Sequence, residues 1–299
     1  MKKSSKKKYP KVAIIIPTLL GGSQVLDCLK SIKALSYPQE KIQIVLIDNN
    51  TPDKIYKRAR SIFKNIKPVR NKKNAGFAKS VNQGIKKVSC PLYFVTNDDI
   101  VFEKNSLKTL IDYALENKNV GIIGGKQLDA TTGKFRSGGK NFNFFTGLQY
   151  EKKHSKIPEI CDTVEGCSML IKNSTIKKIG YFDENYFPAY CEDLDYCTGA
   201  KRQGVGIFYH PKAIFYHRVN YTVSTFPLSQ IYFMTFKNKL RFMIKNAKLY
   251  QLLTFVLFHY LLAIPYRMIF LDEPILKPQI KAIIWNLKNL NKTIEQREW

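Results

Sequence analysis

The sequence is poor in acidic residues. Among 299 residues, 23 are Asp or Glu and 49 are Lys or Arg, which gives a formal net charge of +26. An excess of this size favours an anionic partner. We expect that partner to be a membrane face, because attraction adds about 1 kcal/mol for each basic residue near an anionic lipid surface. Nucleic acid is the competing partner.

Cysteine is present, but without the spacing of a metal or redox motif. No two of the six cysteines stand in the C-x-x-C pattern, so the common zinc and thiol-redox motifs are excluded. Four cysteines lie between residues 161 and 197, which leaves a disulfide among them open. We expect reduced thiols in a cytosolic protein, because disulfides are rare in that compartment.

The amino terminus does not complete the pattern of a signal peptide. Its basic start, MKKSSKKKYPK, leads into VAIIIP, where Pro17 and Thr18 interrupt the apolar run and no small-residue cleavage site follows. We therefore predict a basic tail at residues 1–10 that leads into a buried strand.

The carboxyl-terminal region has an uncharged stretch that is short for a membrane span. The stretch is LYQLLTFVLFHYLLAIPY at 249–266, and it contains Gln251, His259 and Pro265, whereas a span needs about 20 apolar residues. Before it, FKNKLRFMIKNAK alternates apolar and basic residues at a helical period. We predict that 226–299 is helical and associates with a membrane, as an interfacial helix or a shallow hairpin. A buried core helix is the alternative.

Apolar β-branched runs alternate with amphipathic stretches in the first 115 residues. We predict buried strands at 12–17, 42–47, 67–70 and 92–96, and helices at 25–35, 53–64, 75–87 and 107–115. This alternation indicates an α/β fold with a mostly parallel sheet and helices on both faces. After residue 120, frequent glycines indicate hairpins or a long flap, followed by a strand at 168–171 and helices at 173–179 and 194–203.

Polar residues follow three of the predicted strands. They are Pro17-Thr18, Asp48-Asn49-Asn50 and Asn97-Asp98-Asp99. In an open α/β sheet, ligands bind at the carboxyl ends of the strands, so these clusters predict one concave site. The alternative at each position is an ordinary polar turn.

The acidic residues in these clusters suit a sugar nucleotide and a cation. Asp48 can accept a hydrogen bond from a base N–H or a ribose hydroxyl. Asp98 and Asp99 diverge if the backbone is extended, so one can bind a sugar hydroxyl while the other holds a cation. Hard oxygen ligands beside phosphates suit Mg²⁺ or Mn²⁺, and His217 is a further candidate ligand.

The segment CEDLDYC, at 191–197, concentrates carboxylates that are scarce elsewhere. It can be a helix start, where acids stabilise the helix dipole by roughly 0.3–1 kcal/mol each, or a metal site, or the base of an active site. Tyr186, Phe187 and Tyr190 nearby favour a base, because apolar surroundings raise the pKa of a carboxyl group.

In this order, the motifs resemble those of family-2 glycosyltransferases of the GT-A fold, most closely their rhamnosyltransferase-like branch. The resemblance covers about residues 10–220. It rests on VAIIIPTLLGG, IVLIDNN, NAGFAKSVNQGI, FVTNDDIVF, GCSMLIKNSTIKKIGYFDENYF, EDLDYC and FYHR.

The resemblance implies roles for the matching residues. Asp193 matches the catalytic base, with Glu192 beside it. Asp99 and His217 match the ligands of Mg²⁺ or Mn²⁺. The residues implied to bind the nucleotide sugar are Pro17, Thr18, Asp48, Asn50, Gly76, Lys79 and Asp98. Those implied to lie towards the acceptor are Gly166, Cys167 and Tyr190.

Two positions depart from the family pattern. Asn97 occupies the first position of the D-x-D-type motif, so we do not expect it to ligate the metal directly. Arg218 follows His217, where many relatives have a second histidine.

The resemblance implies a metal-dependent, inverting glycosyltransferase for cell-surface polysaccharide, with rhamnosyl transfer as one option. The expected partners are a dTDP- or UDP-sugar, a glycan or polyprenyl-linked acceptor and the cytoplasmic face of the cell membrane, but no nucleic acid. Residues 11–225 would form the GT-A domain and 226–299 the membrane-associating tail. The alternatives are a basic nucleic-acid-binding protein and a non-catalytic nucleotide-sugar-binding scaffold.

Overall fold

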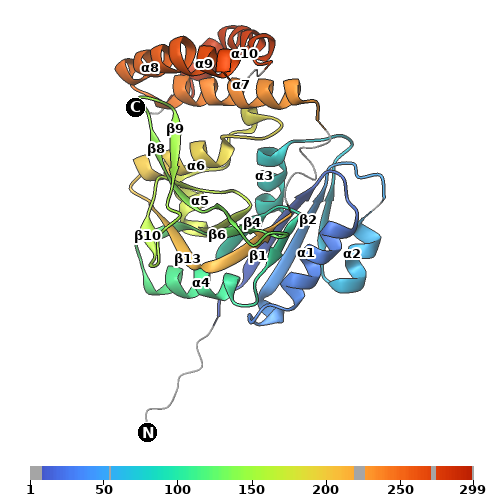
Figure 1. Ribbon diagram of the computed structural model, residues 1–299. Coiled ribbons are helices and arrows are strands. Elements are labelled where there is room, and N and C mark those ends of the chain that lie inside the picture. Colours follow the sequence, from blue (N-terminus) through green and yellow to red (C-terminus); the bar gives the residue numbers. More distant parts are fainter. Residues whose placement is uncertain (1–8, 54, 219–225, 271–273, 298–299) are drawn as a thin grey trace.

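The computed structural model of the chain describes residues 9–53, 55–218, 226–270 and 274–297 (Figure 1). Most of the basic tail predicted at 1–10 lies outside these residues. The domain boundary predicted after residue 225 adjoins the gap at 219–225. Both therefore stay predictions.

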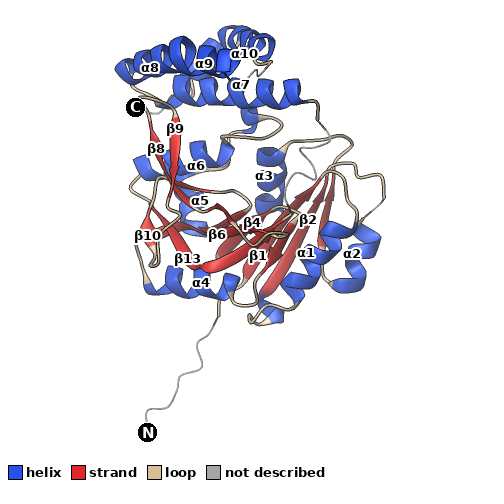
Figure 2. Ribbon diagram, in the orientation of Figure 1, coloured by secondary structure: helices blue, strands red, loops and turns tan. Residues whose placement is uncertain are grey.

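A ten-stranded sheet forms the centre of the fold, with the main order β10-β13-β6-β12-β4-β1-β2-β3 (Figure 2). Its amino-terminal strands are parallel, and they are β1 (Val12–Thr18), β2 (Ile42–Asp48), β3 (Lys67–Arg70) and β4 (Leu92–Thr96). All seven residues of β1 are buried, and Ile14 and Ile15 belong to separate apolar clusters on opposite faces. Burial on both faces explains why this strand is a continuous apolar run.

Helices cover both faces of the sheet, as predicted. One face packs against α1 (Ser23–Lys33), α2 (Tyr56–Ile62) and α4 (Ser106–Glu116). The other packs against α3 (Phe77–Lys87), α5 (Asn173–Ile179) and α6 (Glu192–Arg202).

The region after residue 120 is a central strand, so the predicted hairpins or flap are wrong at this point. The strand is β6 (Val120–Asp129), and its partners are β12 (Ser168–Lys172), which is antiparallel, and β13 (Gly206–His217), which is parallel. A Cβ on Gly124 would lie 2.5 Å from the side chain of Val164. Glycine therefore permits close packing here and does not mark a turn.

Short strands complete the sheet, and a flap lies beside it. The edge strands are β5 (Ile100–Phe102), β7 (Phe135–Ser137) and β10 (Glu159–Ile160). A separate three-stranded sheet contains β8 (Gly139–Asn143), β9 (Leu148–Glu151) and β11 (Thr163–Val164). A hairpin flap therefore exists, but it begins well after residue 120.

The carboxyl-terminal helices lie together at the end of the molecule opposite α4 (Figure 1). They are α7 (Leu228–Asn246), α8 (Leu249–Val256), a π-helical segment (Leu257–Ala263), α9 (Ile264–Phe270), α10 (Leu276–Lys288) and α11 (Leu290–Ile294). The continuous helix Leu249–Ile269 has 21 residues and a mean hydropathy of 1.6, so it is long and apolar enough to cross a membrane. Because only 17% of its apolar stretch is buried, the alternative of a buried core helix is wrong.

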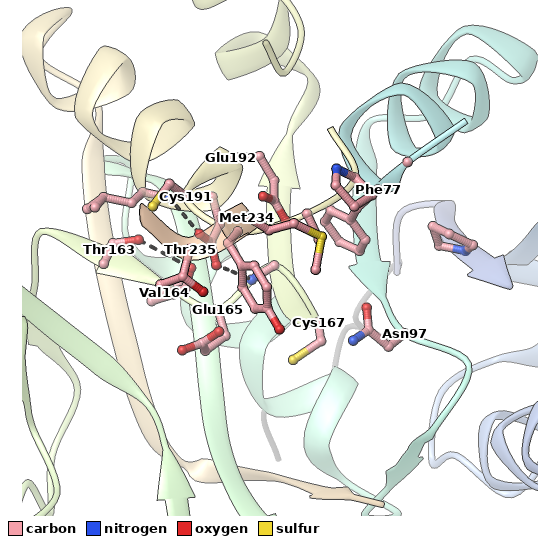
Figure 3. A pocket seen from close by; sticks show the side chains of 18 of the residues that line it. Phe77, Asn97, Thr163, Val164, Glu165, Cys167, Cys191, Glu192, Met234 and Thr235 are labelled. Atoms are coloured by element: carbon pink, nitrogen blue, oxygen red, sulfur yellow. Dashed lines mark hydrogen bonds between the residues drawn. The ribbon is translucent and has the colours of Figure 1, made fainter. Parts of the chain in front are cut away.

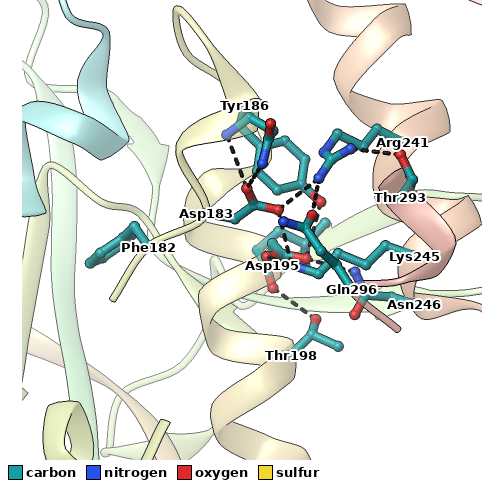
Figure 4. Close-up of polar contacts among 12 residues, drawn as sticks. Phe182, Asp183, Tyr186, Asp195, Thr198, Arg241, Lys245, Asn246, Thr293 and Gln296 are labelled. Carbon is teal, nitrogen blue, oxygen red and sulfur yellow. Dashed lines mark hydrogen bonds and ion pairs between the residues drawn. The ribbon is translucent and has the colours of Figure 1, made fainter. Parts of the chain in front are cut away.

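A buried ionic cluster fixes α7 to the segment that surrounds the start of α6 (Figure 4). Asp183 Oδ2 accepts hydrogen bonds from Arg241 Nη2 at 2.9 Å and from Lys245 Nζ at 3.1 Å. Lys245 Nζ also lies 2.7 Å from Asp195 Oδ2, and the hydroxyl of Tyr186 donates to Asp195 Oδ1 at 3.0 Å. Asp195, the third acid of CEDLDYC, therefore holds the tail.

Arg241 is the critical cation of this cluster, because its side chain is completely buried. Burial alone raises the pKa of Asp183, but the charges of Lys245 and Arg241 outweigh burial and hold that pKa well below its usual range. Removing one partner of a buried pair leaves an incompletely compensated charge.

We expect Arg241→Met to lower the free energy of unfolding by about 3 kcal/mol in urea denaturation. The matched control is Arg58→Met, which removes a solvent-exposed 3.0 Å pair with Asp53, and we expect it to lower the free energy of unfolding by at most about 1 kcal/mol.

The ionised form of Asp183 is stabilised in the folded state, so this contribution to stability is present above the pKa that Asp183 has in the unfolded chain. The difference between wild type and Arg241→Met should narrow below pH ~4. Equal losses for the two variants would contradict a structural role for the cluster.

Candidate active site

One cleft of ≈ 680 Å³ lies at the carboxyl ends of β1 and β4, next to the segment that precedes α6. The predicted site residues that line it are Pro17, Thr18, Gly76, Asp98, Asp99, Gly166, Cys167, Tyr190, Glu192, Asp193 and His217. Asp99 and Asp193 come from different elements, and the fold brings them to one cavity.

Asp98 and Asp99 turn to different partners. Thr18 donates from Oγ1 to Asp98 Oδ2, whereas Asp99 Oδ1 lies 3.3 Å from His217 Nε2. Burial raises the pKa of Asp98 to about 7, although the hydrogen bond from Thr18 opposes this rise. Asp98 thus joins the ends of β1 and β4, while Asp99 and His217 form a separate pair.

Gln127 favours one tautomer of His217. Gln127 Nε2 donates to Ser168 Oγ at 3.2 Å, and its Oε1 then lies 3.2 Å from His217 Nδ1. An oxygen at this position favours a proton on Nδ1, and in that tautomer the lone pair of Nε2 is directed to the side of Asp99.

Asp99 and His217 fit a divalent cation. Asp99 Oδ1 is buried and accepts no hydrogen bond within the described part of the chain. A free carboxylate oxygen beside an imidazole lone pair suits Mg²⁺ or Mn²⁺. The described residues contain no cluster of three or more His, Cys, Asp or Glu that could hold a metal, so substrate phosphates and water would supply the remaining ligands.

Asp193 is a half-buried carboxylate held in place by backbone N–H groups. Gly166 donates to Oδ2 at 3.1 Å, and Leu194 donates to Oδ1 at 2.8 Å. Burial raises the pKa of Asp193 to about 6, and the charge of Glu165 adds to this rise, whereas Lys140 and the two N–H groups oppose it. A carboxylate with this pKa can accept a proton near neutral pH.

Glu192 differs from its neighbour in its contacts. It is 7% exposed, and its Oε2 has no hydrogen-bond partner among the described residues. Burial, together with the charge of Asp193, raises the pKa of Glu192 well above its usual range. Figure 3 shows Glu192 between Phe77 and Met234 in the cleft.

The backbone before Glu192 is strained, and α7 holds it. Tyr190 and Cys191 have φ angles of 82° and 68°, a region that side chains other than glycine rarely adopt. The amide nitrogen of Asn238, on α7, is completely buried and lies 2.7–3.0 Å from the carbonyl oxygens of Tyr186, Ala189 and Tyr190. The tail therefore fixes the conformation of the segment that leads to Asp193.

Gly76 connects the other side of the cleft to the same segment. Its φ is 79°, and a Cβ there would lie 2.8 Å from the ring of Phe187 and 3.0 Å from the carbonyl oxygen of Pro188. The N–H of Phe77 donates to that carbonyl oxygen at 2.8 Å. Glycine is required at this position by contact with the protein itself, in addition to any contact with a ligand.

Three residues predicted to bind the nucleotide do not line the cleft, namely Asp48, Asn50 and Lys79. The oxygens of Asp48 are already bonded, one to the N–H of Thr51 at 2.7 Å and the other to Arg70. Asn50 and Lys79 are exposed to solvent. Their roles in binding the nucleotide therefore stay predictions.

Asn49 lines this corner of the cleft, within the cluster Asp48-Asn49-Asn50 that was predicted to belong to the site. Its amide nitrogen lies 2.9 Å from Ser80 Oγ, and its oxygen accepts from Asn71 at 2.8 Å. Asn49 follows Asp48 and turns to the opposite side, because side chains alternate along an extended chain.

Lys140 and Glu165 form a missed ion pair beside Asp193, and together they adjust its pKa. Lys140 stands opposite Thr163 across the β8–β11 ladder, a pairing that no local sequence pattern reveals. Glu165 could have been predicted as a site residue from the sequence, because it directly precedes Gly166 in the motif EGCSML.

Residues 13–177 match the family model described as Glycosyl transferase family 2. A poly-β-1,6-N-acetyl-D-glucosamine synthase of Staphylococcus epidermidis is 22% identical over 224 residues, which cover 74% of this chain and 53% of the relative. A glycosyltransferase of Rickettsia bellii is 27% identical over 181 residues, covering 59% of this chain and 25% of the relative. The chain thus spans about half the length, or less, of these two curated relatives.

Solved structures share the fold at low sequence identity. A mannosyltransferase from Pyrobaculum calidifontis, in complex with GDP-Man and Mn²⁺, has a TM-score of 0.61 and 14% identity, with 95% of this chain and 76% of that chain covered. GalNAc-T7 with UDP, GalNAc and Mn²⁺ has a TM-score of 0.69 and 13% identity, with coverages of 96% and 58%. These similarities confirm the GT-A fold. Because the family model matches more than half of its residues, the chain belongs to glycosyl transferase family 2.

Proposed function

We propose that this family-2 glycosyltransferase moves a sugar from a nucleotide-diphosphate donor to an acceptor hydroxyl, with inversion at the anomeric carbon and with the help of a divalent cation. One observation carries the proposal: a pair that fits a cation, Asp99 and His217, and a carboxylate with a raised pKa, Asp193, line one cleft.

Asp99 Oδ1 and His217 Nε2 would hold Mg²⁺ or Mn²⁺. A bound cation offsets the negative charge of the departing nucleoside diphosphate. Gln127 keeps His217 in the tautomer that presents its lone pair, and Thr18 keeps Asp98 turned away from the cation site.

Asp193 takes the proton from the acceptor hydroxyl. The acceptor oxygen attacks the anomeric carbon from the face opposite the nucleotide, and the bond between this carbon and the diphosphate oxygen breaks. A single displacement inverts the anomeric centre, so no covalent nucleophile is needed. The geometry parallels that of inverting glycosidases, in which the base lies across the ring from the leaving group. Glu192, whose Oε2 has no hydrogen-bond partner among the described residues, forms a hydrogen bond with a sugar hydroxyl.

We propose a dTDP- or UDP-sugar as donor, with rhamnose the sugar suggested by the motifs of the rhamnosyltransferase-like branch. The acceptor is a glycan or polyprenyl-linked glycan of the cell surface. A polysaccharide product is supported by the name of the Staphylococcus epidermidis relative. Nucleic acid is not a substrate in this proposal, because the cleft is lined by carboxylates that repel its phosphates.

We propose that the tail lies flat on the cytoplasmic face of the membrane. One side of the helix Leu249–Ile269 packs on α7 through Phe255 and Ile264. The opposite side exposes a row of leucines, namely Leu253, Leu257, Leu261 and Leu262, each 56–64% exposed. α10 lies beside this helix and exposes Ile280, Lys277 and Lys281 (Figure 1). An apolar face flanked by lysines suits the interface of an anionic bilayer.

Asp193→Asn should lower kcat by about 10²–10⁴, because the amide cannot accept the acceptor proton. Release of nucleotide from the donor in the presence of acceptor measures the rate, and the affinity for the donor should stay within about twofold. The matched control is Glu40→Gln, an exposed carboxylate that does not line the cleft, which should have wild-type kcat.

The pH dependence provides a second readout of the same residue. Asp193 must be deprotonated, so the wild-type rate should fall as the pH drops through about 6. Lys140, Glu165 and Glu192 surround this carboxylate and set that midpoint. An Asp193→Asn enzyme with an undiminished rate, or with the same acid limb, would contradict the assignment of the base.

Chelation of divalent cations should reduce the wild-type rate by at least about a hundredfold, which corresponds to roughly 3 kcal/mol of charge stabilisation. Asp99→Asn and His217→Ala should each raise the Mn²⁺ concentration needed for half-maximal rate. Asp53→Asn, an acid outside the cleft, is the control and should not change that concentration. Full activity in EDTA would show that no cation acts at this pair.

Leu257→Glu combined with Leu261→Glu should weaken binding to vesicles that contain anionic lipid by at least tenfold in a sedimentation assay, because two charges would enter the apolar interface. Leu115→Glu is the matched control, because Leu115 is 43% exposed on α4 at the opposite end of the molecule. Wild-type binding that was equal on neutral vesicles, or unchanged in the double variant, would argue against a membrane-bound tail.

A further inference from the structure

The cleft continues beyond Asp193 into an end that the proposed chemistry does not use. Its walls there come from α7 and from the β8–β9 hairpin, through Phe142, Leu148, Met234, Thr235, Lys239 and Phe242. Figure 3 shows Met234 and Thr235 close to Cys191 and Glu192. These six residues are mainly apolar, and Lys239 is the cation among them.

Lys239 is exceptional among the cations of α7. Lys237 donates to the carbonyl oxygen of Phe187, Arg241 pairs with Asp183, and Lys245 pairs with both acids of the buried cluster. Within the described part of the chain, Lys239 forms no hydrogen bond or ion pair, yet it is the cation of α7 that lines the cleft. Burial lowers the pKa of its ammonium group. An anion in the cleft would offset this cost.

The apolar walls lead from Lys239 to the exposed tail. Phe142 and Phe242 pack in one cluster with Phe255 of α8, and their rings lie 5.1 Å apart. The tip of the hairpin also contacts α8, since Gly147 packs against Phe255 and the ring of Phe145 lies 6.0 Å from that of Tyr250. The far end of the cleft is thus adjacent to the helix whose outer side presents leucines to solvent.

We propose that this end of the cleft binds the phosphate or diphosphate group of a lipid-linked acceptor, with Lys239 on the anion and the first part of the lipid chain against Met234, Phe242 and Leu148. The inference rests on the proposed function, and it selects among acceptors: it requires an anionic amphiphile and excludes a free neutral glycan.

The position of Lys239 also restricts which hydroxyl reacts. Lys239 is close enough to Cys191 to affect the pKa of its thiol, and Cys191 is two residues from Asp193. The hydroxyl that Asp193 deprotonates therefore belongs to a sugar near the anionic group. The acceptor is accordingly a short lipid-linked saccharide, and the diphosphate of the donor occupies the other end of the cleft, at Asp99 and His217.

The test is calorimetric binding of farnesyl diphosphate, below its micellar concentration, to the full chain saturated with UDP and Mn²⁺. Farnesyl phosphate, inorganic pyrophosphate, farnesol and glucuronate are the comparison ligands. We expect farnesyl diphosphate or farnesyl phosphate to bind at least tenfold more tightly than pyrophosphate, farnesol or glucuronate, because only these two present both an anion and a chain.

Lys239→Met keeps the apolar stem but removes the charge, and it should weaken binding of the farnesyl esters at least tenfold. Lys239→Arg should restore most of the affinity, and Lys118→Ala, an exposed lysine on the far side of the sheet from α7, should not change it. Unchanged affinity in Lys239→Met, or equally tight binding of glucuronate, would overturn the inference.

A separate titration with UDP and Mn²⁺ distinguishes a failure of the acceptor subsite from a failure of the proposed function. If wild type and Lys239→Met bind UDP and Mn²⁺ equally, the variant is folded and the donor end is intact, so a failure with the farnesyl esters counts against the acceptor subsite alone. If wild type binds the farnesyl esters but not any nucleotide diphosphate with Mn²⁺, the proposed function fails and the lipid subsite stands.

Discussion

The buried contact between α7 and residues 183–195 is the constraint on which the rest of the site depends. The side chains of Asp183 and Asp195 are largely buried. Arg241 and Lys245 compensate their negative charges only if α7 lies in one position. Partly compensated buried charges are costly, so intermediate positions are strongly disfavoured. Asn238 lies on this fixed helix, and its side chain donates a hydrogen bond to the carbonyl oxygen of Tyr190, where the backbone is strained. The tail is therefore part of the active site, although its residues are distant in sequence from the glycosyltransferase motifs.

The scarcity of acids in the chain makes the positions of the buried ones informative. In CEDLDYC the three carboxylates have three separate environments: burial raises the pKa of Glu192 well above its usual range, the pKa of Asp193 is raised to about 6, and Asp195 is bound by Lys245. These differences arise from neighbours and burial, since the intrinsic pKa values of the residues are similar. The protein has a net charge of +26, but carboxylates line the cleft. The proposed cation site therefore lies among acids and apart from the lysines of the surface.

The parts of the fold that follow local rules could be predicted from the sequence. β1, β2 and β4 are uninterrupted apolar runs, and the polar residues after them do converge, because parallel strands end at one edge of a sheet. β6 was not predicted, because glycine occurs both in turns and where two segments pack closely. The sequence does not distinguish a turn from a close contact such as that of Gly124 with Val164. Lys239 and Lys140 were missed for another reason, since each acquires its role from contacts across the fold.

The contact of Gly76 with Phe187 has a mechanical consequence. No space remains for a methyl group between the turn that begins α3 and the segment that precedes α6, and a backbone hydrogen bond joins them there. Asn82 of α3 also forms hydrogen bonds with the backbone of Phe182. A displacement of the beginning of α3 therefore also displaces the strained backbone beside Asp193.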